Sequence, residues 1–537
     1  MRFTRREFLQ QSGIAGAAWA LHQSHSQKPV PKFRTQLITS SLAQFVDPLP
    51  IPDVAAAIGS RPSPTPSQLP IPYYRIAIRQ FESKVHRDLK PTRQWGFAAS
   101  SAAATSPGPT FETRSGQGLL VEWANELPEA HFLPIDNSVH GAETDKPQVR
   151  TVIHLHGGKT PPDSDGYPEN WYVPGKSAVF HYPNRQDAAM LWYHDHALGI
   201  NRLNLFAGLM GAFIVRDEAE DALNLPRGKY EIPLIFYDRV FDLEGQLNYP
   251  VSGDPQKPWT PEVFGDAILV NGKLYPYLEV EPRKYRFRVL NGSNARFFHL
   301  SLPGGRGFHQ IGTDQGLLPA PVQLERVSLA PAERADLVVD FAGFAGSNLV
   351  LKNDFATTVM QFRVAPTGSR DPSALPQTLR PVPKMAESMA IKTRKLSLVE
   401  VDDLVGRPFK MLLNNMHWNM AVTENPVLDS AEIWELLNTT DDAHPIHLHL
   451  VRFQILDRRS FDVAAYWMQN GVVKYTGAAV PADPSEAGWK DTVRADPGMV
   501  TRIIARFEGF PGRYVWHCHI LEHEDNEMMR PFDVLTR

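Results

Sequence analysis

Histidine is unevenly distributed along this chain, because ten of its 19 histidines lie in four short segments. The segments are His154-Leu155-His156, His194-Asp195-His196, His444-Pro445-Ile446-His447-Leu448-His449, and His517-Cys518-His519 followed by His523. Side chains alternate along a β-strand, so each His-x-His pair places two imidazoles on one face. A single pair is often an accident of a surface or core, but four segments from two distant parts of the chain indicate metal binding. A fold that satisfies this pattern brings strands from both parts together.

Cys518, the single cysteine of the chain, narrows the choice of metal. A thiolate, two histidines and a weak thioether are the ligands of blue-copper electron-transfer sites. Cys518, His523, Met528 and one histidine from 444–449 can supply this set. Zinc is the alternative metal, but structural zinc needs four ligands and hydrolytic zinc three, and neither explains so many histidines. A lone cysteine is more often a small buried hydrophobe, although rarely one flanked by histidines.

The segment around Cys518 also indicates how two metal sites could be connected. His517 and His519 point to one face of a strand and Cys518 points to the other, so one tripeptide can bind a mononuclear copper and a cluster. Such an arrangement suits an enzyme that takes up electrons singly and delivers four of them to dioxygen.

Length and composition favour a multidomain β protein. At about 100–200 residues per domain, 537 residues predict about three domains. The 36 glycines and 46 prolines favour a turn-rich β protein over a helical one. The net charge of −4 gives no electrostatic footprint for nucleic acid or an anionic membrane, so we expect neither as a partner.

Short runs of alternating apolar and polar residues predict half-buried strands. They include Tyr73–Arg79, Leu119–Trp123 and Val149–His156, then Glu231–Tyr237, Tyr285–Leu290 and Phe297–Leu302, and a third set from about Leu396 onward. Five prolines between Pro366 and Pro383 indicate an interdomain linker. The pattern therefore predicts three antiparallel β-sandwiches or barrels in series.

The first residues resemble a twin-arginine export signal. Arg5-Arg6 precede an apolar run from Gly13 to Leu21, and Ala18-Trp19-Ala20 offers a cleavage site after Ala20. The alternatives are a membrane anchor and a chance pair of arginines. Because the apolar run is far shorter than the ~20 residues that span a bilayer, we expect no anchor. We expect a periplasmic or secreted protein.

The four histidine segments, in this order and spacing, resemble those of the multicopper oxidase family. The resemblance extends to Phe132–Asp136, Asp163–Pro168, Gly488–Thr492 and Tyr514–Arg530, and is greatest to the bacterial spore-coat laccase and bilirubin oxidase branch. It implies an all-β chain of three consecutive cupredoxin-like Greek-key β-barrel domains. The implied division is a signal peptide and tail over 1–26, domains over 45–226 and 227–365, a Pro-rich linker over 366–393, and a third domain over 394–537.

The resemblance also implies four copper ions per chain and assigns their ligands by motif position. The type 1 ligands are His444, Cys518, His523 and the axial Met528, the type 2 ligands are His154 and His447, and the type 3 ligands are His156, His194, His196, His449, His517 and His519. His523 is the implied entry point for electrons, nearest the reducing substrate. Glu524 and Asp165 are implied proton relays, because reduction of dioxygen to water consumes protons.

The predicted function is that of a laccase-like or bilirubin oxidase-like enzyme. It would oxidise phenols, aromatic amines or bilirubin one electron at a time and reduce dioxygen to water. A cuprous or ferrous metallo-oxidase is the alternative enzyme, although the 13 methionines form no methionine-rich segment. A structural protein of the same fold that has lost copper is a further alternative, against which all twelve ligand positions are filled. Without heptads or basic tails, we expect a monomer.

Overall fold

The computed structural model describes residues 36–65, 69–100, 102–254, 257–304, 307–354, 356–403, 406 and 408–536. The predicted export signal at 1–26 lies outside these residues. No helix in the described ranges combines the length and apolar character needed to cross a membrane.

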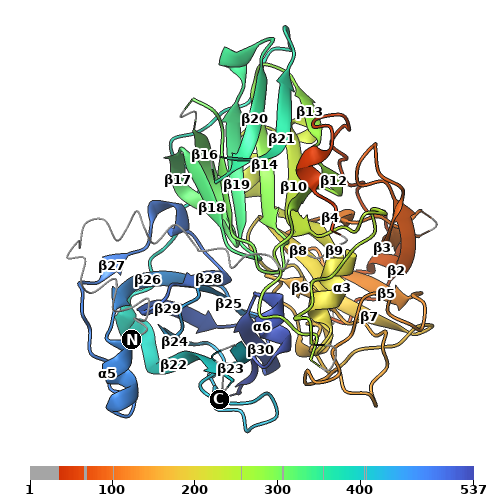
Figure 1. The fold of residues 1–537 in the computed structure, drawn as a ribbon. Coiled ribbons are helices and arrows are strands. Elements are labelled where there is room, and N and C mark those ends of the chain that lie inside the picture. The colour runs from red at the N-terminus through yellow and green to blue at the C-terminus, as the bar shows by residue number, and fades with distance from the viewer. Residues whose placement is uncertain are drawn as a thin grey trace, which may run out of the picture.

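The described residues form six β-sheets, which occur as three pairs along the chain (Figure 1). The first pair uses strands from residues 59–216, the second from 231–364 and the third from 390–534. In Figure 1 the second pair (green) lies above the first (orange to yellow) and the third (cyan to blue), which are side by side. The predicted all-β class is confirmed, and the three pairs follow the order of the predicted domains.

The first pair contains two of the four histidine segments. Its sheets have the orders β1-β2-β5-β7, with β3 beside β2, and β4-β9-β8-β6. The strands are β1 Gly59–Arg61, β2 Ile71–Ser83, β3 Thr92–Ala99, β4 Gly108–Arg114, β5 Leu119–Asn125, β6 Ile153–His156, β7 Ser177–Tyr182, β8 Ala189–Asp195 and β9 Met210–Arg216, and the helices are α3 Asn201–Ala207 and α4 Glu218–Asp221. β8 is buried throughout because Tyr193 packs into the core around Trp123, while His194 stacks on Trp192 at the opposite face.

The second pair contains none of the histidine segments. Its sheets have the orders β12-β11-β10-β14-β19-β16-β17 and β13-β21-β20-β15-β18. The strands are β10 Glu231–Arg239, β11 Ala267–Val270, β12 Lys273–Leu274, β13 Tyr277–Val280, β14 Lys284–Asn291, β15 Phe298–Ser301, β16 Phe308–Thr313, β17 Gly316–Leu324, β18 Arg326–Leu329, β19 Arg334–Asp340, β20 Asn348–Asn353 and β21 Thr357–Val364. Alternate apolar residues of both sheets, such as Phe287 and Phe362, form its core.

The third pair contains the other two histidine segments. Its sheets have the orders β23-β22-β24-β29-β26-β27 and β28-β25-β30-β31. The strands are β22 Ala390–Asp402, β23 Pro408–Leu413, β24 Ser430–Asn438, β25 His444–Leu448, β26 Phe453–Ser460, β27 Val480–Pro481, β28 Thr492–Ala495, β29 Met499–Phe507, β30 Gly512–Cys518 and β31 Met529–Val534, and the helices are α5 Val463–Met468 and α6 Leu521–Asp525. Helix α6 contacts α3 of the first pair, so the two pairs meet beside their histidines.

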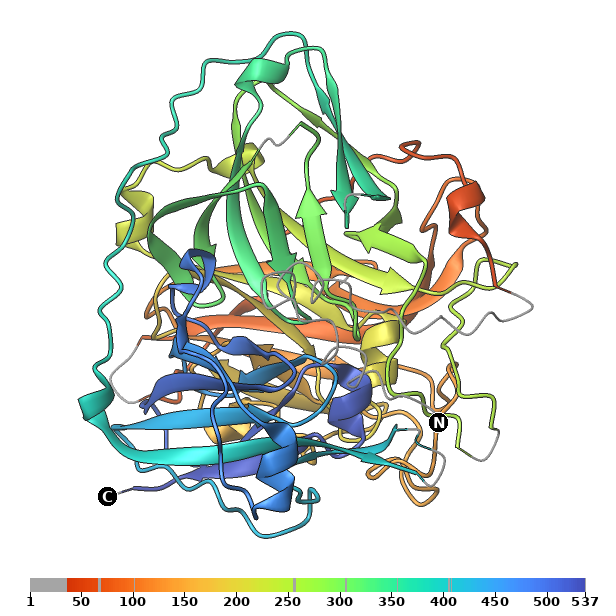
Figure 2. The ribbon, with the colours of Figure 1, turned by 60° about the vertical axis from the view of Figure 1, so that its left-hand side comes forward.

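Two predicted boundaries differ from the structure. The predicted strand Val149–His156 begins only at Ile153, because the main chain before it pairs elsewhere, with Thr151 forming an isolated bridge to Tyr172. The third set of strands begins at Ala390, inside the predicted linker. Figure 2 shows the preceding segment (teal) running along the outside of the molecule from the second pair to the third.

Candidate metal centres

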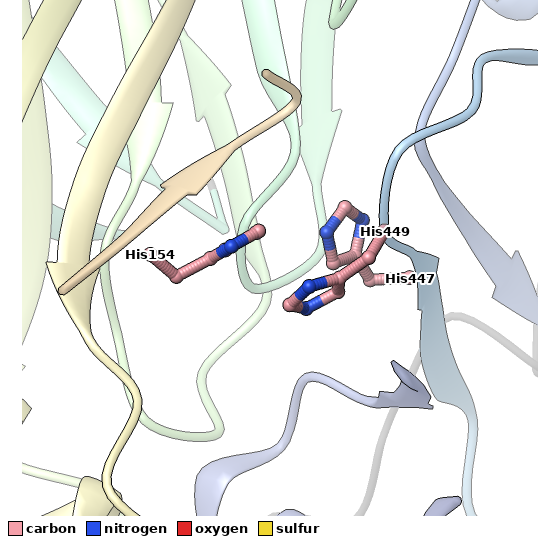
Figure 3. A group of neighbouring side chains, drawn as sticks. All are labelled: His154, His447 and His449. Carbon is pink, nitrogen blue, oxygen red and sulfur yellow. The ribbon is translucent and has the colours of Figure 1, made fainter. Parts of the chain in front are cut away.

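Four strands bring the histidine segments together at the boundary between the first and third sheet pairs. β6 and β8 are antiparallel with His154 opposite His194, and β25 and β30 are antiparallel with His447 opposite His517. Because side chains alternate along each strand, the two histidines of each His-x-His pair share one face, whereas His444 of β25 lies on the other face with Cys518. Figure 3 shows His154 on β6 facing His447 on β25 and His449, which directly follows β25.

The eight buried histidines at this boundary fall into three groups. The groups are His154 with His447 and His449, His156 with His194 and His519, and His196 with His449 and His517, and the ligand atoms of each group lie within 4.8 Å of one another. His517 Nε2 lies 3.3 Å from both His196 Nε2 and His449 Nε2. Each group combines histidines of the first pair with histidines of the third, so its geometry depends on how the two pairs pack.

The protonation and hydrogen bonding of these rings fit a bound metal. Burial and neighbouring histidines lower the pKa of His154, His194 and His447 well below its ordinary value, so the rings are neutral. Each Nδ1 faces a main-chain carbonyl, at 2.6, 2.7 and 2.7 Å respectively. Each Nε2 is buried without a hydrogen-bond partner. A neutral imidazole that is oriented by one nitrogen and open at the other is suited to bind a metal.

A separate group within the third pair combines His444, Cys518 and His523. The Cys518 Sγ atom lies 3.6 Å from His444 Nδ1 and 3.8 Å from His523 Nδ1, and the two nitrogens are 3.2 Å apart. Met528 is buried in the same apolar cluster as Cys518. Burial raises the pKa of the Cys518 thiol well above its ordinary value, so the thiol keeps its proton until a bound metal displaces it. These donors match a blue-copper site.

The two sets of ligands are adjacent along β30. His517 belongs to the boundary group with His196 and His449, and Cys518, the next residue, points to the opposite face beside His444. His519 follows directly and joins His156. The predicted connection through one tripeptide therefore has the expected arrangement of side chains.

His523, predicted to lie nearest the reductant, has 0% of its surface exposed. The helix α6 that carries it is covered by a segment of chain around Trp259, whose Nε1 donates to the Glu522 carbonyl at 3.0 Å. The imidazole of His523 is therefore shielded from solvent by the residues around it.

Two buried carboxylates border the histidine groups at the positions predicted for proton relays. Asp165 Oδ2 lies 2.6 Å from His449 Nδ1. Glu524 lies 3.1 Å from His517 Nδ1, and its Oε1 accepts a hydrogen bond from Asn201 Nδ2 at 2.7 Å. Both carboxylates thus contact the ring nitrogen of a histidine that belongs to the cluster.

The two carboxylates differ in their protonation. Burial raises the pKa of Asp165 to about 8. Burial also acts on Glu524, but the neighbouring His517 and His196 outweigh it and lower the pKa of Glu524 to about 2. At neutral pH, Asp165 can donate a proton and Glu524 can accept one.

Sequence reasoning missed Asp491, a third carboxylate at the cluster. Its Oδ1 lies 3.1 Å from His156 Nε2, and its main-chain carbonyl faces His447 Nδ1 at 2.7 Å. The three residues form a further group whose possible ligand atoms lie within 4.8 Å of one another. The sequence signal that could have pointed to Asp491 is the resemblance of the segment Gly488–Thr492 to the multicopper oxidase family. No pattern in the sequence points to Arg334, the partner of Asp491 in the second pair.

Comparisons with known proteins agree with this geometry. Models of multicopper oxidase domains match residues 144–220 and 391–537. A laccase from Bacillus subtilis is 46% identical over 521 residues, covering 92% of this chain and 99% of the relative. A laccase from Bacillus stratosphericus is 45% identical, covering 92% and 100%. The crystal structure of a laccase from Pediococcus acidilactici superposes with a TM-score of 0.74 at 28% identity, covering 92% of this chain and 95% of that one.

The fold, the histidine groups and these matches lead to one assignment. The chain belongs to the multicopper oxidase family. It is a copper-dependent oxidoreductase that uses dioxygen as its acceptor.

Proposed function

We propose that this protein is a laccase-type oxidase that takes single electrons from phenols, aromatic amines or bilirubin-like tetrapyrroles and reduces dioxygen to water. The observation that carries the proposal is the arrangement of three histidine groups across two sheet pairs beside a separate His-Cys-His group. The laccase names of the two Bacillus relatives support the choice of aromatic reductants.

The histidine groups fit four copper ions per chain. His444, Cys518 and His523, with Met528 as axial ligand, would hold the type 1 ion, His154 and His447 the type 2 ion, and the triads His156, His194, His519 and His196, His449, His517 the two type 3 ions. When bound, copper would supply one-electron redox chemistry at the first site and dioxygen reduction at the other three.

The residues of the chain itself connect the two copper sites, donate and accept protons beside the cluster, and exclude water from it. The main chain joins Cys518 to His517 and His519, which gives electrons a short covalent path. Asp165 holds a proton beside Nδ1 of His449, and the ionised Glu524 can accept one beside Nδ1 of His517. All of the histidine ligands are buried, which keeps bulk water from the reacting centre.

We also propose that the protein works as a monomer in the periplasm or outside the cell. The Arg5-Arg6 pair and the apolar run after it support export through the twin-arginine route. This route carries proteins that are already folded. Small aromatic reductants and dioxygen are the partners that this function requires.

Oxygen uptake by the copper-loaded protein tests the proposal. A phenolic dye, bilirubin, ferrous ion and cuprous ion are compared in one buffer, with Cys518→Ser loaded in the same way as the control. We expect a higher kcat/KM for the organic reductants. A large advantage for the metal ions would instead identify a metallo-oxidase, and no uptake with any reductant would identify a structural protein.

A further inference from the structure

We propose that Arg334, from the sheet pair that supplies no copper ligand, is a positioning residue for the trinuclear histidines and acts through Asp491. The inference rests on the proposed function, because it concerns the copper that this function requires. By this inference the second sheet pair helps to orient the histidines of the cluster, in addition to connecting the first pair to the third.

Arg334 is fully anchored. It begins β19, is 2% exposed, and its five N–H groups all have acceptors. Nε donates to the Met190 carbonyl at 3.2 Å, and the two terminal nitrogens donate to the carbonyls of Ala332 at 3.1 Å and Asp314 at 3.0 Å. The remaining two N–H groups grip both oxygens of Asp491, with Nη1 to Oδ1 at 2.7 Å. A guanidinium held at every donor fixes the plane of the carboxylate.

Asp491 transmits this constraint to both halves of the cluster. Its Oδ1 lies 3.1 Å from Nε2 of His156, which comes from the first pair. Its main-chain carbonyl lies 2.7 Å from Nδ1 of His447, which comes from the third pair. The Nδ1 of His156 is buried without a hydrogen-bond partner, so it is the nitrogen left to bind metal. Carboxylates that hold the second ring nitrogen orient metal-binding histidines.

Gln315, at the turn between β16 and β17, completes the contact from the second pair. Its Nε2 donates to Asp491 Oδ2 at 2.6 Å and to the Gly157 carbonyl at 2.9 Å. Gly157 follows His156 directly and has a φ of +85°. A Cβ at this position would approach Asp491 Oδ2 to 2.6 Å and Arg334 Nη2 to 2.9 Å. The histidine strand, the carboxylate and the arginine are therefore packed without spare room.

The charges around Asp491 explain why an arginine is needed. Asp314 lies next to it, with Oδ2 3.4 Å from the Asp491 main-chain nitrogen. Lys490 is already shared between Asp314 and Glu333, at 3.0 Å from each. Without Arg334, Asp491 would be a buried carboxylate beside other carboxylates with no cation of its own, and would turn away from its present position. Its contact with His156 would then be lost or reoriented.

Copper retention by the loaded protein tests this inference. Arg334→Lys keeps the charge but cannot grip both oxygens. The holoprotein is dialysed against a copper chelator. Type 1 copper is followed by its blue absorption. Trinuclear copper is followed by the total copper content and by the paramagnetic signal of the type 2 ion. We expect trinuclear copper to be held roughly 10- to 100-fold more weakly, as when other partners of metal-binding histidines are removed, with type 1 copper unchanged.

A matched control separates this role from general stability. Arg286→Lys makes the same change at a buried arginine of the second pair that grips Asp336 but touches no histidine of the cluster. It should leave both kinds of copper in place. Equal losses in Arg286→Lys and Arg334→Lys, or trinuclear copper held normally in Arg334→Lys, would overturn the inference.

Two further variants test the route through Asp491. Gln315→Leu removes one neutral hydrogen-bond donor, preserves the ion pair, and should weaken trinuclear copper less than Arg334→Lys does. Combining Arg334→Lys with Asp491→Asn should be no worse than the stronger single change, because both act on one contact. Additive losses would overturn the inference. If the wild-type protein holds no trinuclear copper, the proposed function itself is refuted. If the wild type holds copper normally and the variants do too, only the role of Arg334 is refuted.

Discussion

The ligand groups proposed for mononuclear and trinuclear copper are built in different ways. His444, Cys518 and His523 all belong to the third sheet pair and lie within its own core. Every trinuclear group instead takes histidines from both the first and third pairs. The mononuclear group therefore depends on the fold of one sheet pair, whereas the trinuclear groups depend also on how two pairs are held together. Variants that affect one centre and not the other test this difference.

The largest expected effect comes from Cys518→Ser. The variant should lose its blue colour and its oxygen uptake, because the thiolate is both a ligand and the link to His517 and His519. Its trinuclear copper should remain near the wild-type level, since the eight histidines at the boundary are untouched. Absorption, copper content and oxygen uptake measure these effects. Met528→Leu is the control and should stay blue, because a thioether is a weak ligand. Loss of trinuclear copper from Cys518→Ser would contradict the independence of the two centres.

Glu524→Gln should impair dioxygen reduction at the trinuclear centre without changing the mononuclear centre. Removing a positioned proton acceptor should slow turnover roughly 10²- to 10⁴-fold, while the blue colour is retained because Glu524 touches no mononuclear ligand side chain. Oxygen uptake across a range of pH measures the effect. Glu527→Gln, a buried carboxylate that contacts Lys410 and the Trp418 main chain, is the control. Unchanged turnover at every pH would falsify the relay role of Glu524.

Arg202→Met should weaken the boundary between the first and third pairs. Arg202 on α3 donates to Asp525 on α6 at 3.0 Å, and both side chains are buried. Leaving Asp525 unpaired should lower the free energy of unfolding by about 3–5 kcal/mol and release trinuclear copper before type 1 copper. Denaturant unfolding and copper content measure this. Arg513→Met removes an exposed pair with Asp533 and should cost no more than about 1 kcal/mol.

Acid should weaken a third region, the ion cluster between the first and second pairs. Burial opposes the charge of Glu231, but Arg288, Arg286 and Arg216 lower the pKa of Glu231 from 4.5 to about 2. Because the folded-state pKa is the lower one, the stabilisation is complete above pH ~4.5 and disappears as the pH falls toward about 2. It amounts to about 3 kcal/mol. Unfolding free energies of wild type and Glu231→Gln should therefore differ near neutral pH and converge in acid, and a constant difference would count against this account.

The smallest expected effects come from two matched threonine variants. Thr440 Oγ1 lies 2.7 Å from His444 Nε2, and Thr492 Oγ1 lies 3.1 Å from His156 Nε2. Each hydroxyl orients one ligand, so Thr440→Val should weaken type 1 copper by roughly tenfold and Thr492→Val trinuclear copper by a similar factor. Each variant is the control of the other in a chelator competition. Loss of both kinds of copper from either variant would show that the centres are coupled.

The candidate ligand residues could be picked out of the sequence because their signals are local. His-x-His spacing depends only on the alternation of a strand, and β6 and β30 have that alternation. The burial of His523 was not predictable, since it depends on tertiary packing around α6, where Trp259 from a distant part of the sequence contacts Glu522. Arg334 was equally hidden, because it lies 157 residues from Asp491 and follows no periodic pattern.

The amino-acid sequence settles which atoms can bind copper and which of them are covalently adjacent, because alternation and chain neighbours are properties of a few consecutive residues. The tertiary structure decides which histidines share a group, which carboxylate orients each ring, and that the second sheet pair reaches the cluster. These outcomes depend on packing and burial between segments hundreds of residues apart, such as His156 and Asp491, which lie 335 positions apart in the chain. Only the folded chain brings those atoms within hydrogen-bond distance.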